Sequence, residues 1–136
     1  MKAHVGVDSK TKIIHTAVAT AANVADSAVL PDLLHGEERR MWGDHAYRGQ
    51  SQVIRECALQ AKTAPIGVTA TRSYRRSGAG EEPDQVDVRS KVEHVFAVMK
   101  LKFGFVKLRY RGLKKNATQL FAVCALVNLY LARKKL

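Results

Sequence analysis

Hydrophobic and polar positions alternate at the start of the chain, which is typical of half-buried β-strands. Residues 3–8 alternate in this way, and residues 13–20 are rich in β-branched side chains. A short polar link joins them, so the sequence predicts two antiparallel strands in a hairpin. A third short apolar run, residues 40–44, ends in Asp44 and predicts a further strand of the same sheet.

The middle of the chain mixes short helical patterns with turn-forming residues. Residues 27–35 are a short helix candidate that Pro31 is expected to interrupt. Residues 50–61 have helical spacing, and residues 62–66 are a weaker strand candidate. Residues 67–85 are rich in Gly, Ser and mixed charge, which predicts a loop.

The strongest helical pattern covers residues 86–103. At about 100° per residue, one arc of this helix holds six apolar side chains: Val88, Val92, Val95, Phe96, Met99 and Phe103. We expect the helix to pack on the sheet through Val92, Phe96 and Met99, and to end at Gly104. Together, the strands and helices predict an α/β fold with a mixed sheet and flanking helices.

The C-terminal third adds two more elements. Residues 105–111 alternate apolar and basic side chains, which predicts a strand or an extended arm. Asn116–Gln119 resembles a capping box and is expected to open a helix over residues 117–132, apolar nearly all round. Its apolar run is shorter than the roughly 18–20 residues that a bilayer span needs, so it predicts a buried helix and no membrane segment.

Composition and charge narrow the function. The 136 residues fit one domain and carry 23 Lys and Arg against 12 Asp and Glu, a net charge of +11. No acidic residue follows Glu93, whereas residues 94–136 hold 10 basic ones. Segregated positive charge favours a nucleic-acid partner, although a solubilising surface is the simpler alternative.

Two acidic residues are candidates for metal chemistry. Asp44 follows a predicted strand, where open α/β sheets bind ligands. Glu93 shares a narrow stripe of the long helix with Arg89 and Lys100. Paired carboxylates bind Mg²⁺ or Mn²⁺. The positively charged side chains of Arg89 and Lys100 could hold phosphates. The alternatives are a turn-forming Asp and an ordinary Arg–Glu pair on a solvated face.

Basic and aromatic side chains interleave between residues 100 and 115. This segment holds Lys100, Lys102, Phe103, Phe105, Lys107, Arg109, Tyr110, Arg111, Lys114 and Lys115. We expect Lys107, Arg109 and Arg111 to contact DNA phosphates. For the aromatic rings we expect packing in the core rather than stacking on bases.

Several stretches of the chain resemble the insertion-sequence DDE transposases, most closely their IS-five group. The stretches follow the family's order and spacing over essentially the whole chain: residues 1–8, His15–Val18, Ala22–Asp26, Gly43–Gly49, Val88–Phe96 and Phe103–Gly112. The resemblance implies an RNase H-like fold in which three carboxylates hold two Mg²⁺ ions. It also implies that the family cuts DNA at the element's ends and joins the freed 3′-OH to a target.

The resemblance assigns particular residues. The family's second Asp corresponds to Asp44 and its Glu to Glu93, while Arg89 and Lys100 match the Arg and Lys of its helix motif. The family's Tyr in that motif is replaced by Val86. Mg²⁺ or Mn²⁺ is the implied cofactor, and DNA is the implied partner.

The family's first Asp lies upstream of the segment that Lys2–Asp8 matches, and Asp8 matches a different family Asp. Residues 1–136 are therefore expected to be one incomplete RNase H-like domain, a C-terminal portion that binds DNA in the bacterial cytoplasm, near the nucleoid, and is inactive alone. Whether Asp8 can replace the absent Asp is open. An exposed sheet edge predicts self-association. The alternatives are a non-enzymatic basic nucleic-acid-binding protein, or a regulator that assembles with full-length transposase.

Overall fold

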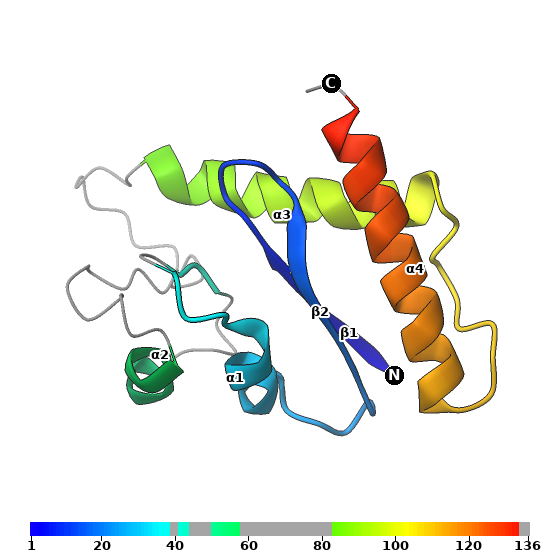
Figure 1. Ribbon diagram of the computed structural model, residues 1–136, viewed down its shortest axis with the longest axis horizontal. Helices are drawn as coiled ribbons and strands as arrows, with labels where there is room; N and C mark the ends of the chain where they lie inside the picture. The colour runs from blue at the N-terminus through cyan, green and yellow to red at the C-terminus, as the bar shows by residue number, and fades with distance from the viewer. Residues whose placement is uncertain (39–40, 44–49, 58–82, 134–136) are drawn as a thin grey trace, which may run out of the picture. The chain divides into compact units, whose positions relative to one another are not determined.

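The computed structural model describes residues 1–38, 41–43, 50–57 and 83–133, and it leaves out the side chains of Ser51 and residues 83–89. The chain divides into two compact units. The first comprises Met1–Val24 with Arg89–Leu136, and the second comprises Ala25–Val88. Figure 1 shows the helices and the two-stranded sheet with their labels.

The predicted hairpin is confirmed in the first unit. Strand β1, Lys2–Val7, pairs antiparallel with β2, Ile14–Thr20. Lys2 lies opposite Thr20, and the register shifts between Gly6 and Val7. β-Branched side chains at alternate positions of β2 suit this pleated, half-buried surface.

The turn between the strands is built around the carboxylate of Asp8. The backbone N–H of Asp8 donates to the carbonyl of Ile13 at 2.9 Å, and the N–H of Lys12 donates to the carbonyl of Asp8 at 2.9 Å. The Asp8 carboxylate accepts hydrogen bonds from the Thr11 N–H at 2.9 Å, from the Thr11 hydroxyl, and from the Lys10 N–H at 3.3 Å. Because its own turn engages this carboxylate, Asp8 has a local structural role.

These contacts predict an acid-dependent contribution to stability. The hydrogen bond from the Thr11 hydroxyl is the main cause that lowers the pKa of Asp8 below its usual 3.8, while partial burial opposes it. A carboxyl whose folded pKa is lowered contributes stability above its unfolded pKa, and loses it as pH falls through the folded value. We expect an NMR titration of Asp8 to give a value below 3.8 that rises in Thr11→Val. A wild-type value at or above 3.8 would contradict the turn geometry.

The long helix α3 covers Pro83–Leu101. The predicted helix over residues 86–103 therefore begins and ends too late, and the loop prediction is wrong for residues 83–85. Proline is tolerated in a helix's first turn, where its missing N–H has no partner to lose. At the other end, Gly104 has a φ of 61° and the Phe105 N–H donates to the carbonyl of Met99 at 3.0 Å. The left-handed glycine ends the helix as expected, but helical structure stops at Leu101.

Helix α4, Leu113–Ala132, packs with α3 over one face of the hairpin (Figure 1). Their core contains these buried side chains: Ile14, Val95, Val98, Met99, Leu120, Val123, Cys124 and Val127. Of the three contacts expected for the long helix, Met99 is fully buried and Phe96 packs against this core, but Val92 is only partly buried. The packing therefore centres one turn further along, on Val95 and Met99.

Helix α4 is apolar nearly all round, yet only one of its faces is buried. Leu120, Val123 and Val127 lie in the core, whereas Phe121 and Leu129 are exposed. Asn128 faces the hairpin: its amide accepts from the Ile14 N–H and donates to the Ile14 carbonyl, both at 2.8 Å. The sequence prediction of a fully buried helix is therefore wrong for one side of α4.

The second unit contains three short helical elements among its described residues. They are η1, Asp26–Val29, a 3₁₀ turn; α1, Leu30–Leu33; and α2, Ser51–Cys57. Val29, Leu30, Leu33 and Ile54 are buried. The predicted helix over 27–35 is shorter than expected, and Pro31 lies in the first turn of α1 rather than interrupting it.

The predicted third strand is not present where the structure describes it. Residues 41–43 have no regular structure. A run of two apolar residues before Gly43 has little side-chain surface to hold a strand in a sheet, which explains the difference. Asp44, residues 58–61 of the predicted helix, the strand candidate 62–66 and most of the predicted loop lie outside the described residues.

Candidate nucleic-acid interface

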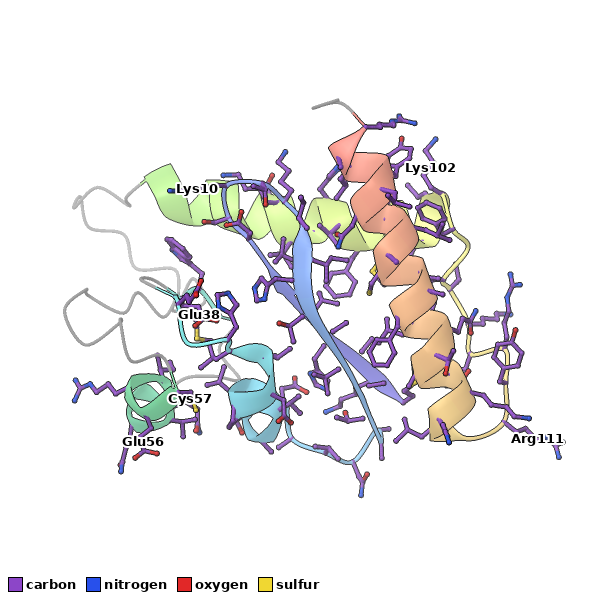
Figure 2. All side chains as sticks on the ribbon, viewed as in Figure 1. Lys10, Glu38, Glu56, Cys57, Lys102 and Arg111 are labelled. Carbon is purple, nitrogen blue, oxygen red and sulfur yellow. The ribbon has the colours of Figure 1, made fainter. Side chains whose placement is uncertain are left out.

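The segment between α3 and α4, residues 102–112, carries a concentration of positive charge, and we call it the basic loop. Its cations are Lys102, Lys107, Arg109 and Arg111, and all four are exposed. Lys100 on α3 and Lys114 and Lys115 on α4 extend the exposed charge to both sides. Figure 2 labels Lys102 near the start of the loop and Arg111 near its end, where the Arg111 side chain extends away from the ribbon.

Aromatic packing fixes the first part of this loop. Phe103 and Phe105 pack against the core, and the Phe103 ring meets Tyr130 edge-on at 6.3 Å between centroids. The Val106 N–H donates to the carbonyl of Gly104 at 2.9 Å. A β-carbon on Gly104 would lie 3.8 Å from a guanidinium nitrogen of Arg109, so this side chain folds back over the turn.

Asn116 fixes the last part of the loop. This residue is buried in the first turn of α4. Its amide oxygen accepts from the Tyr110 N–H at 3.2 Å, and its amide nitrogen donates to the carbonyls of Tyr110 at 2.6 Å and Gly112 at 2.7 Å. One side chain therefore holds the backbone on both sides of Arg111.

The structure corrects two expectations for this segment. Residues 105–111 form turns and bends rather than the predicted strand or extended arm. The capping box at Asn116–Gln119 is also wrong, because α4 begins at Leu113 with Gly112 as its N-cap, at a φ of 90°. The side-chain amide of Asn116 instead forms hydrogen bonds with the backbone of the preceding loop. The local sequence does not distinguish this role from helix capping.

The aromatic side chains divide into two groups. Phe103 and Phe105 are partly buried against the core, as expected. Tyr110 is 52% exposed, so the expectation of core packing is wrong for this ring. The difference arises because Tyr110 lies beyond Phe105, the last residue of the loop that packs against the core, and Asn116 holds its backbone there.

Among the described residues, no carboxylate pairs with the central cations of the basic loop. No acidic residue follows Glu93 in the sequence. Lys107, Arg109 and Arg111 have no carboxylate partner in the part of the chain that the structure describes. Positive charge that is exposed and fixed in position attracts a polyanion and requires little ordering on binding.

The candidate metal ligands are placed only in part. Glu93 is exposed on α3, and Lys100 is exposed seven residues later, about 10 Å further along the helix axis. Arg89 lies on the same helix, with its side chain outside the described part. Within residues 1–38, 41–43, 50–57 and 90–133, no three His, Cys, Asp or Glu side chains gather closely enough to hold a metal ion. Convergence of Glu93 with Asp44 therefore stays a prediction.

Two other features were candidates for function: the thiol of Cys124 and the long apolar helices. Burial raises the pKa of the Cys124 thiol to about 11, so this core residue is not a nucleophile at neutral pH. Among the described helices, none combines the length and apolar character of a membrane crossing.

A comparison with protein families agrees with the resemblance in the sequence. The family model described as the transposase DDE domain matches residues 1–129, a span that includes the hairpin, α3, the basic loop and most of α4. No solved structure gives a significant match to the chain. The mixed α/β architecture is compatible with such a domain, and because the match covers nearly the whole sequence, the chain belongs to the transposase DDE domain family.

Proposed function

We propose that this chain acts in DNA transposition by binding DNA through the basic loop and by contributing Asp44 and Glu93 to a divalent-metal site. The observation that carries the proposal is the exposed positive charge of the basic loop in a chain of the transposase DDE domain family. Lys107, Arg109 and Arg111 bind backbone phosphates, and Arg89 and Lys100 extend this contact along α3. Phosphate contacts of this kind position DNA without reading its sequence.

The proposed metal site rests on the chemistry of its donors. Glu93 is an exposed carboxylate on a rigid helix, and hard cations such as Mg²⁺ take carboxylate oxygens as ligands. Asp44 supplies the second carboxylate by the family resemblance. When bound, divalent ions in such sites stabilise the attacking and leaving oxygens of a phosphodiester. Asp8 is left out because its own turn uses its carboxylate.

The proposal also includes a more specific assignment within the transposase DDE domain family. The sequence resemblance supports membership of the IS-five group, and an antiparallel hairpin with two helices over one face is compatible with an RNase H-like arrangement. Two of the family's three carboxylates correspond to residues of this sequence. We therefore expect the 136-residue chain alone to neither cut nor join DNA bearing the element's ends, with either Mg²⁺ or Mn²⁺.

The metal site is tested by iron-directed cleavage of the polypeptide. Fe²⁺ bound in place of Mg²⁺ reduces added hydrogen peroxide to hydroxide and a hydroxyl radical, with ascorbate to regenerate Fe²⁺, and the radical cuts the nearby backbone; we expect cuts close to both residue 44 and residue 93. Excess Mg²⁺ should suppress both cuts. Asp44→Asn and Glu93→Gln should each remove both cuts, whereas Asp32→Asn, an exposed carboxylate on α1, should leave them unchanged.

Two outcomes would refute parts of the proposal. Cuts at only one of the two positions, or cuts that persist in both variants, would show that Asp44 and Glu93 do not share an ion. DNA strand cleavage by the chain alone that is lost in Asp8→Asn would make Asp8 a metal ligand in spite of its turn.

A further inference from the structure

Tyr110 combines three properties that the phosphate-binding proposal does not use. Its ring is 52% exposed, although the two phenylalanines of the same loop pack against the core. It stands directly between Arg109 and Arg111 in the sequence. Its backbone N–H and C=O are both hydrogen bonded by Asn116, at 3.2 and 2.6 Å.

The Asn116 contacts matter because they reduce the cost of binding. A residue in a mobile loop loses backbone freedom when it binds a ligand, and this loss opposes association. The backbone of Tyr110 is already fixed to a buried side chain of α4, so presenting its ring costs little further entropy. An exposed aromatic ring on a fixed backbone is suited to a flat ligand.

The surrounding charge identifies the class of that ligand. Exposed arginines directly before and after Tyr110 in the sequence, with no carboxylate partner among the described residues, favour a ligand that carries anionic groups as well as a flat one. A nucleic-acid strand has this construction, with bases that alternate along a phosphate backbone. Aromatic rings stack on bases that are not paired, whereas the bases of an intact duplex are stacked on each other.

We propose that Tyr110 stacks on an unpaired base of single-stranded or locally opened DNA, while Arg109 and Arg111 bind the phosphates beside that base. This inference rests on the proposed DNA binding by the basic loop and adds a preference for unpaired bases. Asn116 is then a positioning residue, because it acts on the base only through the backbone of Tyr110.

The test compares two single strands with the same number of phosphates. One is a DNA strand of about 12 nucleotides, within the usual range of binding-site sizes, and the other is its abasic counterpart. Fluorescence anisotropy should show that the wild-type chain binds the base-bearing strand about tenfold more tightly, since stacking of one base contributes a factor of about 5 to 150. Tyr110→Ala should remove this preference, and Tyr110→Phe should retain it.

Phe121→Ala is the matched control. Phe121 is 50% exposed on α4, outside the basic loop, so its loss removes a similar aromatic surface and should leave the preference intact. Tyr110→Ala should also leave the salt dependence of binding unchanged, because the tyrosine carries no charge.

The possible results separate the two proposals. Equal wild-type affinity for both strands, or a preference that survives in Tyr110→Ala, would overturn the stacking inference and leave phosphate binding in place. Absence of binding to either strand and to a duplex would overturn DNA binding by the loop and the stacking inference together.

Discussion

Replacing Lys107, Arg109 and Arg111 together by Ala should weaken duplex DNA binding by up to about 500-fold at 0.1 M salt. Each phosphate contact releases about 0.9 counterion, so three lost contacts reduce the slope of log K against log salt by about 2.7. The factor of 500 follows if the wild-type and variant chains bind equally at 1 M salt. Fluorescence anisotropy over a series of salt concentrations measures both the affinity and the slope.

A control with the same change in net charge separates contact from general attraction. Lys10, Lys12 and Arg55 are exposed outside the basic loop, and their combined replacement by Ala also removes three positive charges. We expect this control to keep most of the wild-type slope. If both triple variants lose affinity equally, the net charge rather than the basic loop determines binding.

Met99→Ala should lower the free energy of unfolding by about 3 kcal/mol, because deletion of a buried methionine loses transfer free energy and leaves a cavity. Met99 has 0% exposure in the core that α3 shares with the hairpin and α4. A small domain has only about 5–15 kcal/mol of total stability, so the variant should unfold at a much lower urea concentration. Helical circular dichroism in a urea titration measures the change.

Leu101→Ala gives the comparison on the same helix. Leu101 is 83% exposed two residues beyond Met99, and a substitution at such a position is expected to change stability by no more than about 0.5 kcal/mol. Similar losses in the two variants would mean that the described core does not hold α3 in solution.

The hairpin and the two long helices could be predicted because the relevant signals are local. Alternation marks the strands, and 3.6-residue periodicity places Met99 and Val95 on the buried face of α3. The helix ends were less predictable: Gly104 marks the end of α3, but the last helical residue, Leu101, is set by backbone hydrogen bonds such as that from the Phe105 N–H to the Met99 carbonyl. The start of α4 was placed at Asn116 because an asparagine before a helical run is read as an N-cap.

The candidate site, too, could be predicted only where its features depend on the local sequence. The charge of Lys107, Arg109 and Arg111 could be predicted from composition alone, and their exposure agrees with it. The partial burial of Phe105 and the exposure of Tyr110 could not be predicted, since both are aromatic residues of the same basic segment. What distinguishes them is the distance of each from the core, which depends on how the loop turns back toward Asn116. That contact joins residues through tertiary structure and leaves no periodic signal.

The two side-chain amide contacts of α4 are expected to couple the opening of the hairpin to that of the basic loop. Asn128 holds the backbone of Ile14 at the start of β2, and Asn116 holds that of Tyr110, about 18 Å away along the helix. An opening that unwinds the whole of α4 breaks both contacts, so in that opening the amide protons of the hairpin and the loop should exchange with solvent as one group. A polyanion that binds only the ordered loop therefore protects the distant hairpin from exchange as well, by mass action on a shared opening equilibrium.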